Sequence, residues 1–152
     1  EGKKIGLNVF LGMEIRFPGS ENDYLVFGMD ELFVRTKEQL YLLGLEKFRD
    51  LAKGRGFFIS QAHPCREGQT LANPILLDGV EVYNGNARHD SHNDLAQMAA
   101  KAYGLRGLSG SDTHQLEDLG RGGIVLPTLP EDSSELTRML MENRVLNLIV
   151  TQ

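Results

Sequence analysis

Short apolar runs alternate with amphipathic stretches along the whole chain. Gly, Pro, Asn or Ser lies close to at least one end of most of these runs, a pattern typical of β-strands. The runs cover residues 7–16, 24–28, 57–62, 79–83, 105–110, 124–126 and 145–150. Apolar positions at helical spacing predict helices between them, over residues 40–52, 91–103 and 133–143, with Gly44 dividing the first helix.

The alternation of strands and helices predicts an α/β protein with mainly parallel strands. The chain has 152 residues, the length of one domain, and we expect residues 1–152 to form a single domain. Its 41% hydrophobic and 24% charged residues are ordinary for a globular protein and exclude an intrinsically disordered chain. A single cysteine, Cys65, excludes a disulfide-stapled scaffold.

The charge and the apolar patterning narrow the range of partners. No apolar run approaches the ~20 residues of a membrane span and residues 1–4 do not start a signal peptide, so we expect a cytoplasmic protein without a membrane partner. A net charge of −5 disfavours nucleic acid. A phosphorylated small molecule stays compatible with this charge, because metal ions can supply local positive charge.

Polar side chains directly follow several of the predicted strands. His63 follows residues 57–62, Asn84 follows the next run, and Asp112 and His114 follow residues 105–110. In a parallel α/β barrel these strand ends meet at one mouth, where active sites lie. Asp112 and His114 leave an extended segment on the same side, and carboxylate with imidazole suits Zn, Mn or Fe.

Other polar residues have both a functional and a structural interpretation. Glu14 points away from its apolar neighbours, and it either binds a metal or forms an exposed or salt-bridged surface group. Arg66 either contacts a phosphate oxygen or lies in solvent. Three further residues are interpreted as loop or helix-cap residues and not as ligands or a nucleophile: Cys65, His89 and His92.

Four motifs in a fixed order resemble the later part of the PHP superfamily, the polymerase and histidinol phosphatase domains. They are Gly12-Met13-Glu14, Gln61-Ala62-His63-Pro64, Glu81-Val82-Tyr83-Asn84 and Gly110-Ser111-Asp112-Thr113-His114. The resemblance covers about residues 12–122. It implies a distorted (β/α)7 TIM-like barrel, here incomplete at its N-terminal end, that binds up to three divalent metal ions at its mouth.

The resemblance also assigns roles to individual residues. It implies that Glu14 bridges two metals, that His63 binds the second and Asp112 the first, and that His114 binds the third. Asp112 is also the candidate catalytic residue that orients the attacking water, and Asn84 lines the mouth beside the substrate. The implied activity is hydrolysis of a small phosphate ester by metal-activated water.

Two features of that family have no counterpart in this sequence. The thirteen residues before Glu14 contain no His-x-His motif, and no histidine occurs between Arg16 and Ala62, where Asp30 is a candidate substitute. These differences leave two alternatives open, a non-catalytic PHP-like module with an incomplete metal site and an amide or ring hydrolase on a related barrel. We expect an upstream segment or a second copy to complete the barrel.

Overall fold

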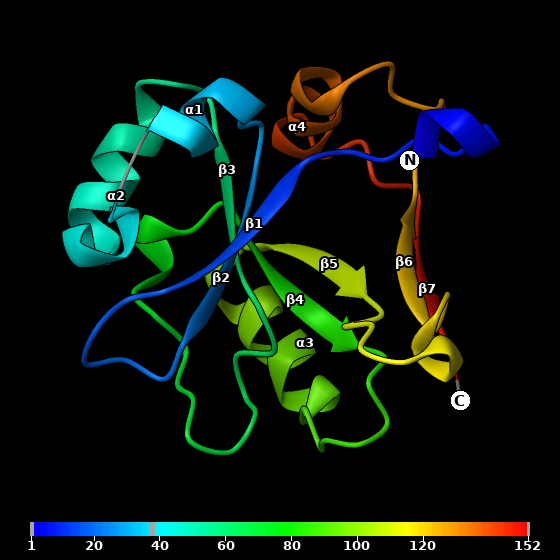
Figure 1. Ribbon diagram of the computed structural model, residues 1–152. Coiled ribbons are helices and arrows are strands. Elements are labelled where there is room, and N and C mark those ends of the chain that lie inside the picture. Colours follow the sequence, from blue (N-terminus) through cyan, green and yellow to red (C-terminus); the bar gives the residue numbers. More distant parts are fainter. Residues whose placement is uncertain (1, 37–38, 152) are drawn as a thin grey trace.

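The computed structural model describes residues 2–36 and 39–151 and contains a five-stranded sheet and a two-stranded ribbon (Figure 1). In the large sheet the strands follow one another in chain order. They are β1 (Gly12–Arg16), β2 (Asp23–Phe27), β3 (Phe58–Gln61), β4 (Gly79–Asn84) and β5 (Arg106–Gly110). The ribbon consists of β6 (Gly122–Val125) and β7 (Asn147–Val150), and it stands beside β5.

The described residues also form four α-helices and four short 3-10 helices. The α-helices are α1 (Glu31–Thr36), α2 (Gly44–Lys53), α3 (Asn93–Tyr103) and α4 (Ser133–Met141). The 3-10 helices are Gly2–Ile5, Leu40–Leu43, Pro74–Leu76 and Leu116–Asp118. The predicted division at Gly44 is confirmed, because this residue has φ +72° and α2 begins there directly after a 3-10 turn. In the described part of the chain no helix has the length and apolar character needed to cross a membrane.

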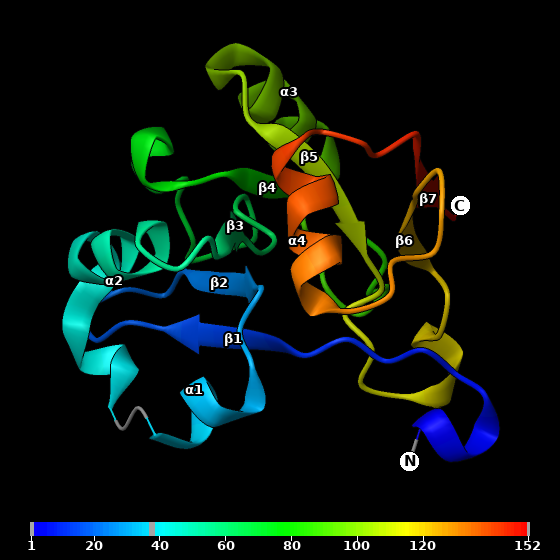
Figure 2. The same cartoon turned by 90° about the horizontal axis from the view of Figure 1, so that it is seen from above.

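The two faces of the sheet carry different residues because successive side chains of a strand point to opposite sides. One face packs against α2 and α3 through a large apolar core that includes Val26, Ile59 and Val80. The other face packs against α4, where Phe58 and Leu140 are buried together. Figure 2 shows α2 and α4 on opposite sides of the central strands. The polar cluster described below lies at the end of the α4 face.

The predicted (β/α)7 barrel, including the incomplete form expected here, is wrong. In the described residues the large sheet is open, with β1 and β5 at its edges, and both β1–β2 and β2–β3 are antiparallel. Only β3–β4 and β4–β5 are parallel. The connection over residues 17–22 explains the first reversal, since a parallel neighbour needs a crossover of about a dozen residues or more.

A buried ion pair joins α2 to the strands. The two terminal guanidinium nitrogens of Arg49, Nη1 and Nη2, donate to the carboxylate of Asp78, at 2.5 and 2.7 Å. The same carboxylate accepts the backbone N–H of Ile59 at 2.9 Å. The two side chains are only 11% and 9% exposed, so little water is available to replace a lost partner.

Replacing Asp78 with alanine should lower the free energy of unfolding by about 3 kcal/mol or more, because it leaves Arg49 charged and buried without its partner. Urea denaturation measures this difference. The control is Glu31→Ala, which removes a 75% exposed ion pair with Arg35 and should cost less than about 0.5 kcal/mol. Equal effects of the two substitutions would contradict the role assigned to the buried pair.

Candidate functional site

Polar side chains from all five strands of the large sheet gather at one edge, the one formed by the carboxyl ends of β3, β4 and β5 and not by an outer strand. Glu14 lies on β1 and Asp23 begins β2, while His63, Asn84 and Asp112 lie at or just after the carboxyl ends of β3, β4 and β5. Because β2 runs antiparallel to β1, its amino end falls at the carboxyl end of β1. The parallel strands β3 to β5 bring their carboxyl ends to that same edge.

Three of these side chains form a compact group of metal-ligand types. One oxygen of Glu14, one oxygen of Asp23 and one ring nitrogen of His63 all lie within 4.8 Å of one another. The Nε2 atom of His63 is 4.0 Å from Glu14 Oε1 and 4.0 Å from Asp23 Oδ2. Two carboxylates with one imidazole suit a divalent transition metal, so the donor set fits the cofactor that the family resemblance implies.

The side chain of Gln69 fixes the orientation of this histidine. The Gln69 amide NH₂ donates to Asp23 Oδ2 at 3.3 Å, which directs its oxygen toward His63 Nδ1 at 3.1 Å. An amide oxygen can only accept, so Nδ1 carries the proton and Nε2 presents its lone pair to the two carboxylates. This is the tautomer that a metal ligand needs, and outer hydrogen bonds of this kind commonly set it.

Asp23 was not predicted from the sequence to belong to the site. Asp30, which was considered as a substitute for a histidine of the family, instead caps a helix. Asp30 caps the start of α1, where its Oδ1 accepts the backbone N–H of Phe33 at 2.6 Å. Asp23 is 8% exposed and is held by Arg16, whose Nε and Nη2 each lie 2.7 Å from a carboxylate oxygen. The signal that could have found Asp23 is a charged residue at the start of an otherwise apolar run.

Arg66 links the ends of β4 and β5. Its Nη2 donates to Asn84 Oδ1 at 3.2 Å, to Asp112 Oδ2 at 3.0 Å and to Ser91 Oγ at 3.0 Å. Burial opposes ionisation of Asp112, but the contact with Arg66 outweighs it and lowers the pKa of this carboxyl. Arg66 therefore favours the ionised form of Asp112 and fixes its position. The guanidinium group of Arg66 is bound to protein groups and does not lie free in solvent.

The buried side chain of Glu81 holds two residues of the site in position. Its carboxylate accepts the backbone N–H of His63 at 2.9 Å and the side-chain NH₂ of Asn84 at 3.0 Å. Gly110 makes room for it, since a Cβ at this position would lie 2.5 Å from Glu81 Oε1. The β4–β5 register shifts between Glu81 and Tyr83, an irregularity of the kind that redirects side chains near active sites.

The electrostatics of the site favour a bound cation. Burial raises the pKa of Glu14, and the negative charges of Asp23 and Asp112 raise it further. Burial lowers the pKa of His63, and the positive charge of Arg66 adds to this effect, so the imidazole is neutral at neutral pH. Carboxylates that repel one another beside a neutral imidazole gain stability when a cation binds between them.

Two of the site residues have strained backbones. His63 has φ 27° and Asp112 has φ 47°, a region that residues with a side chain rarely adopt. Strain of this kind persists where the surroundings fix the conformation, and it concentrates at functional sites. Here the backbone N–H of His63 is held by Glu81, and the side chain of Asp112 is held by Arg66.

His114 lies at the margin of the site. Its side chain is 68% exposed, and its Nδ1 is 3.5 Å from Asp112 Oδ1, so it is not part of the Glu14–Asp23–His63 group. The side chains of His89 and His92 are exposed, and Cys65 is half-buried with its thiol pKa raised by burial. That none of these last three binds a metal stays a prediction.

A comparison with protein families agrees with the last of the four motifs, residues 110–114. Residues 90–145 match a family model described as PHP-associated, and this match confirms the predicted relationship to a C-terminal PHP portion. The matched segment contains Asp112 and His114. Glu14, Asp23 and His63 precede it and lie outside the match.

A solved structure is also similar, the crystal structure of PsfC from Pseudomonas syringae PB-5123. The two share 18% sequence identity with a TM-score of 0.68, over 88% of this chain and 56% of that chain. This likeness concerns the fold alone, and the present chain spans little more than half of that protein. No curated protein matches the sequence.

Replacing Gln69 with leucine should weaken divalent metal binding about 10- to 100-fold, because His63 loses the acceptor that keeps its proton on Nδ1. Isothermal titration with Zn²⁺ or Mn²⁺ measures the affinity, and nitrogen NMR of His63 reports the tautomer without metal. Gln97→Leu, an exposed change on α3, is the control. An unchanged tautomer and affinity in Gln69→Leu would refute this role.

Asp118 holds the loop that follows Asp112, and its side chain is 3% exposed. Arg88 binds both of its oxygens, and the backbone N–H groups of His114 and Gln115 donate to one of them. The contact with Arg88, together with these backbone donors, lowers the pKa of Asp118 far below its usual range. The carboxylate therefore stabilises the folded state at neutral pH.

Asp118→Asn should lower the thermal midpoint by about 2–4 °C or more at pH 7. Because the pKa of Asp118 is depressed in the folded state, its contribution is complete above the unfolded pKa of about 3.9 and is lost as the pH falls below it. The difference from the native chain should therefore shrink in acid. Thermal melts from pH 7 to pH 3 check this, with the exposed Asp50→Asn as control; a difference independent of pH would contradict it.

Proposed function

We propose that this site belongs to a metal-dependent phosphoesterase that acts on a small phosphorylated substrate. The observation that supports the proposal best is the approach of Glu14, Asp23 and His63 to within 4.8 Å, with the histidine in the tautomer of a ligand. The relationship to the PHP-associated family supports it independently.

Glu14, Asp23 and His63 would hold one divalent ion, Zn, Mn or Fe, and Asp112 is the candidate ligand of a further ion at the same edge. Metal ions bound there would lower the pKa of a water molecule toward neutrality and shield the phosphate charge. His114 remains a candidate ligand whose exposed side chain would have to turn inward.

The residues of the chain itself position the water and the phosphate. Asp112, kept ionised by Arg66, accepts a hydrogen bond from the attacking water and orients it toward phosphorus. The water oxygen forms a bond to phosphorus, the ester P–O bond breaks, and the alcohol leaves with a proton. Asn84 and the remaining donors of Arg66 are the candidate contacts for phosphate oxygens.

A non-catalytic binding module is the second candidate, and one observation favours it. Arg16 already pairs with both oxygens of Asp23, as expected for a structural salt bridge. In that alternative the edge binds a phosphorylated ligand or a structural metal without turnover. Metal content and turnover measured on the same sample separate the two functions.

The test combines metal titration with hydrolysis of a generic phosphate monoester. The native chain should bind Zn²⁺ or Mn²⁺, and His63→Ala should weaken binding about tenfold or more. Asp112→Asn should lower kcat about 10²-fold, since the water loses its orienting carboxylate. The control is His89→Ala, which removes an exposed imidazole.

Two results would count against the proposal. A native chain that binds no divalent metal excludes the metal site. A chain that binds metal with the predicted dependence on His63, but hydrolyses no phosphate ester, supports the non-catalytic module.

A further inference from the structure

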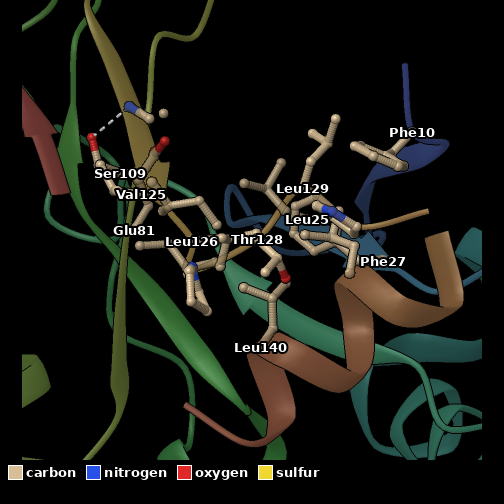
Figure 3. Close-up of a pocket in the computed structure, with 17 residues that line it drawn as sticks. Phe10, Leu25, Phe27, Glu81, Ser109, Val125, Leu126, Thr128, Leu129 and Leu140 are labelled. Atoms are coloured by element: carbon tan, nitrogen blue, oxygen red, sulfur yellow. Dashed lines mark hydrogen bonds between the residues drawn. The ribbon is translucent and has the colours of Figure 1, made fainter. Parts of the chain in front are cut away.

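A cavity of about 710 Å³ lies between the α4 face of the large sheet and the segment that joins β6 to α4 (Figure 3). Its walls come from β2, from β4 and β5, from residues 123–130 and from α4. Figure 3 shows Leu25, Leu126 and Leu140 among the side chains that surround it. The volume falls within the range of about 300–1,000 Å³ that is usual for small-molecule sites.

The lining of the cavity is almost entirely apolar. Glu81 is the single charged side chain among the described residues that line it, and it is 4% exposed. The hydroxyl of Ser109 is already engaged, because it donates to the Ile149 carbonyl at 2.6 Å and accepts the Gly123 N–H at 3.0 Å. The cavity therefore suits an uncharged organic group and disfavours a second phosphate or a sugar rich in hydroxyls.

The cavity borders the candidate metal group. Leu25, in its wall, is the cross-strand partner of Glu14 in the β1–β2 pair, so the two side chains stand next to each other on the same face. Glu81, also in its wall, holds the backbone of His63. Gly110 completes this end of the cavity two residues before Asp112.

We propose that the cavity holds the apolar organic group of the phosphate ester whose phosphate is bound beside Glu14, His63 and Asp112. The inference rests on the proposed phosphoesterase function and adds the substrate class, an ester of phosphate with an aryl or branched alkyl alcohol. A short polar alcohol would leave the apolar walls in contact with water and would gain nothing from them.

Two phosphate monoesters test this substrate class, 1-naphthyl phosphate and glycerol 2-phosphate. Their leaving groups differ in intrinsic reactivity, so each variant is compared with the native chain on the same ester. Ile124→Trp fills the cavity from β6 and should raise KM for the naphthyl ester about tenfold, with little change for the glycerol ester. Leu129→Trp, at a 68% exposed wall position, is the second variant should Ile124→Trp not fold.

Direct binding provides a readout that needs neither metal nor turnover. The fluorescence of 1-naphthol should report binding to the metal-free native chain and weaker binding to both cavity variants. Ile75→Trp adds the same side chain at a 74% exposed position away from the cavity and should behave as the native chain does.

The two levels of inference fail in different ways. If both esters are hydrolysed, naphthol does not bind and the cavity variants change neither KM, the substrate class is wrong and the phosphoesterase stands. If naphthol binds but neither ester is hydrolysed with metal present, the phosphoesterase is wrong, and the role of the cavity in holding its substrate is overturned with it.

Discussion

The arrangement of the site depends on one buried carboxylate. Glu81 is 4% exposed, yet it meets two donors, the backbone N–H of His63 and the amide of Asn84. A buried carboxylate without such donors would be costly, so these contacts constrain the loop after β3 and the end of β4 together. The absence of a side chain at Gly110 extends the constraint to β5. The positions of three strand ends are thus coupled through a residue that lies outside the Glu14–Asp23–His63 group.

Much of the site could be predicted from the sequence, because its residues follow apolar runs and such runs become strands. His63, Asn84 and Asp112 were identified in this way, and the structure brings them to one edge. Asp23 could not be found by the same rule, since it begins its strand and does not follow it. Only the pairing direction of β2 reveals that the start of this strand lies beside the end of β1.

The fold class was predicted wrongly for a related reason, the unknown direction in which the strands pair. Alternating strands and helices favour parallel pairing, but the two-residue repeat of side-chain direction is the same in parallel and antiparallel strands and does not give the direction of pairing. The connection at residues 17–22 is too short for a crossover, so its length favours antiparallel pairing of the two strands that it joins. The contacts of Arg66 with Asn84 and Asp112 could not be predicted either, because they join residues that are far apart in the sequence.

The β1–β2 hairpin has a consequence for the choice of metal. Its register places Glu14 and Asp23 on neighbouring strands within ten residues, so these two carboxylates approach each other through local structure alone. The imidazole of His63 joins them only when β3 docks on β2. Carboxylates alone bind hard ions such as Ca²⁺ and Mg²⁺, whereas an imidazole favours Zn²⁺ and its neighbours. In the proposed metal site, long-range folding would therefore add an imidazole, and with it a preference for Zn²⁺ and its neighbours, to a pair of carboxylates that the hairpin already brings together.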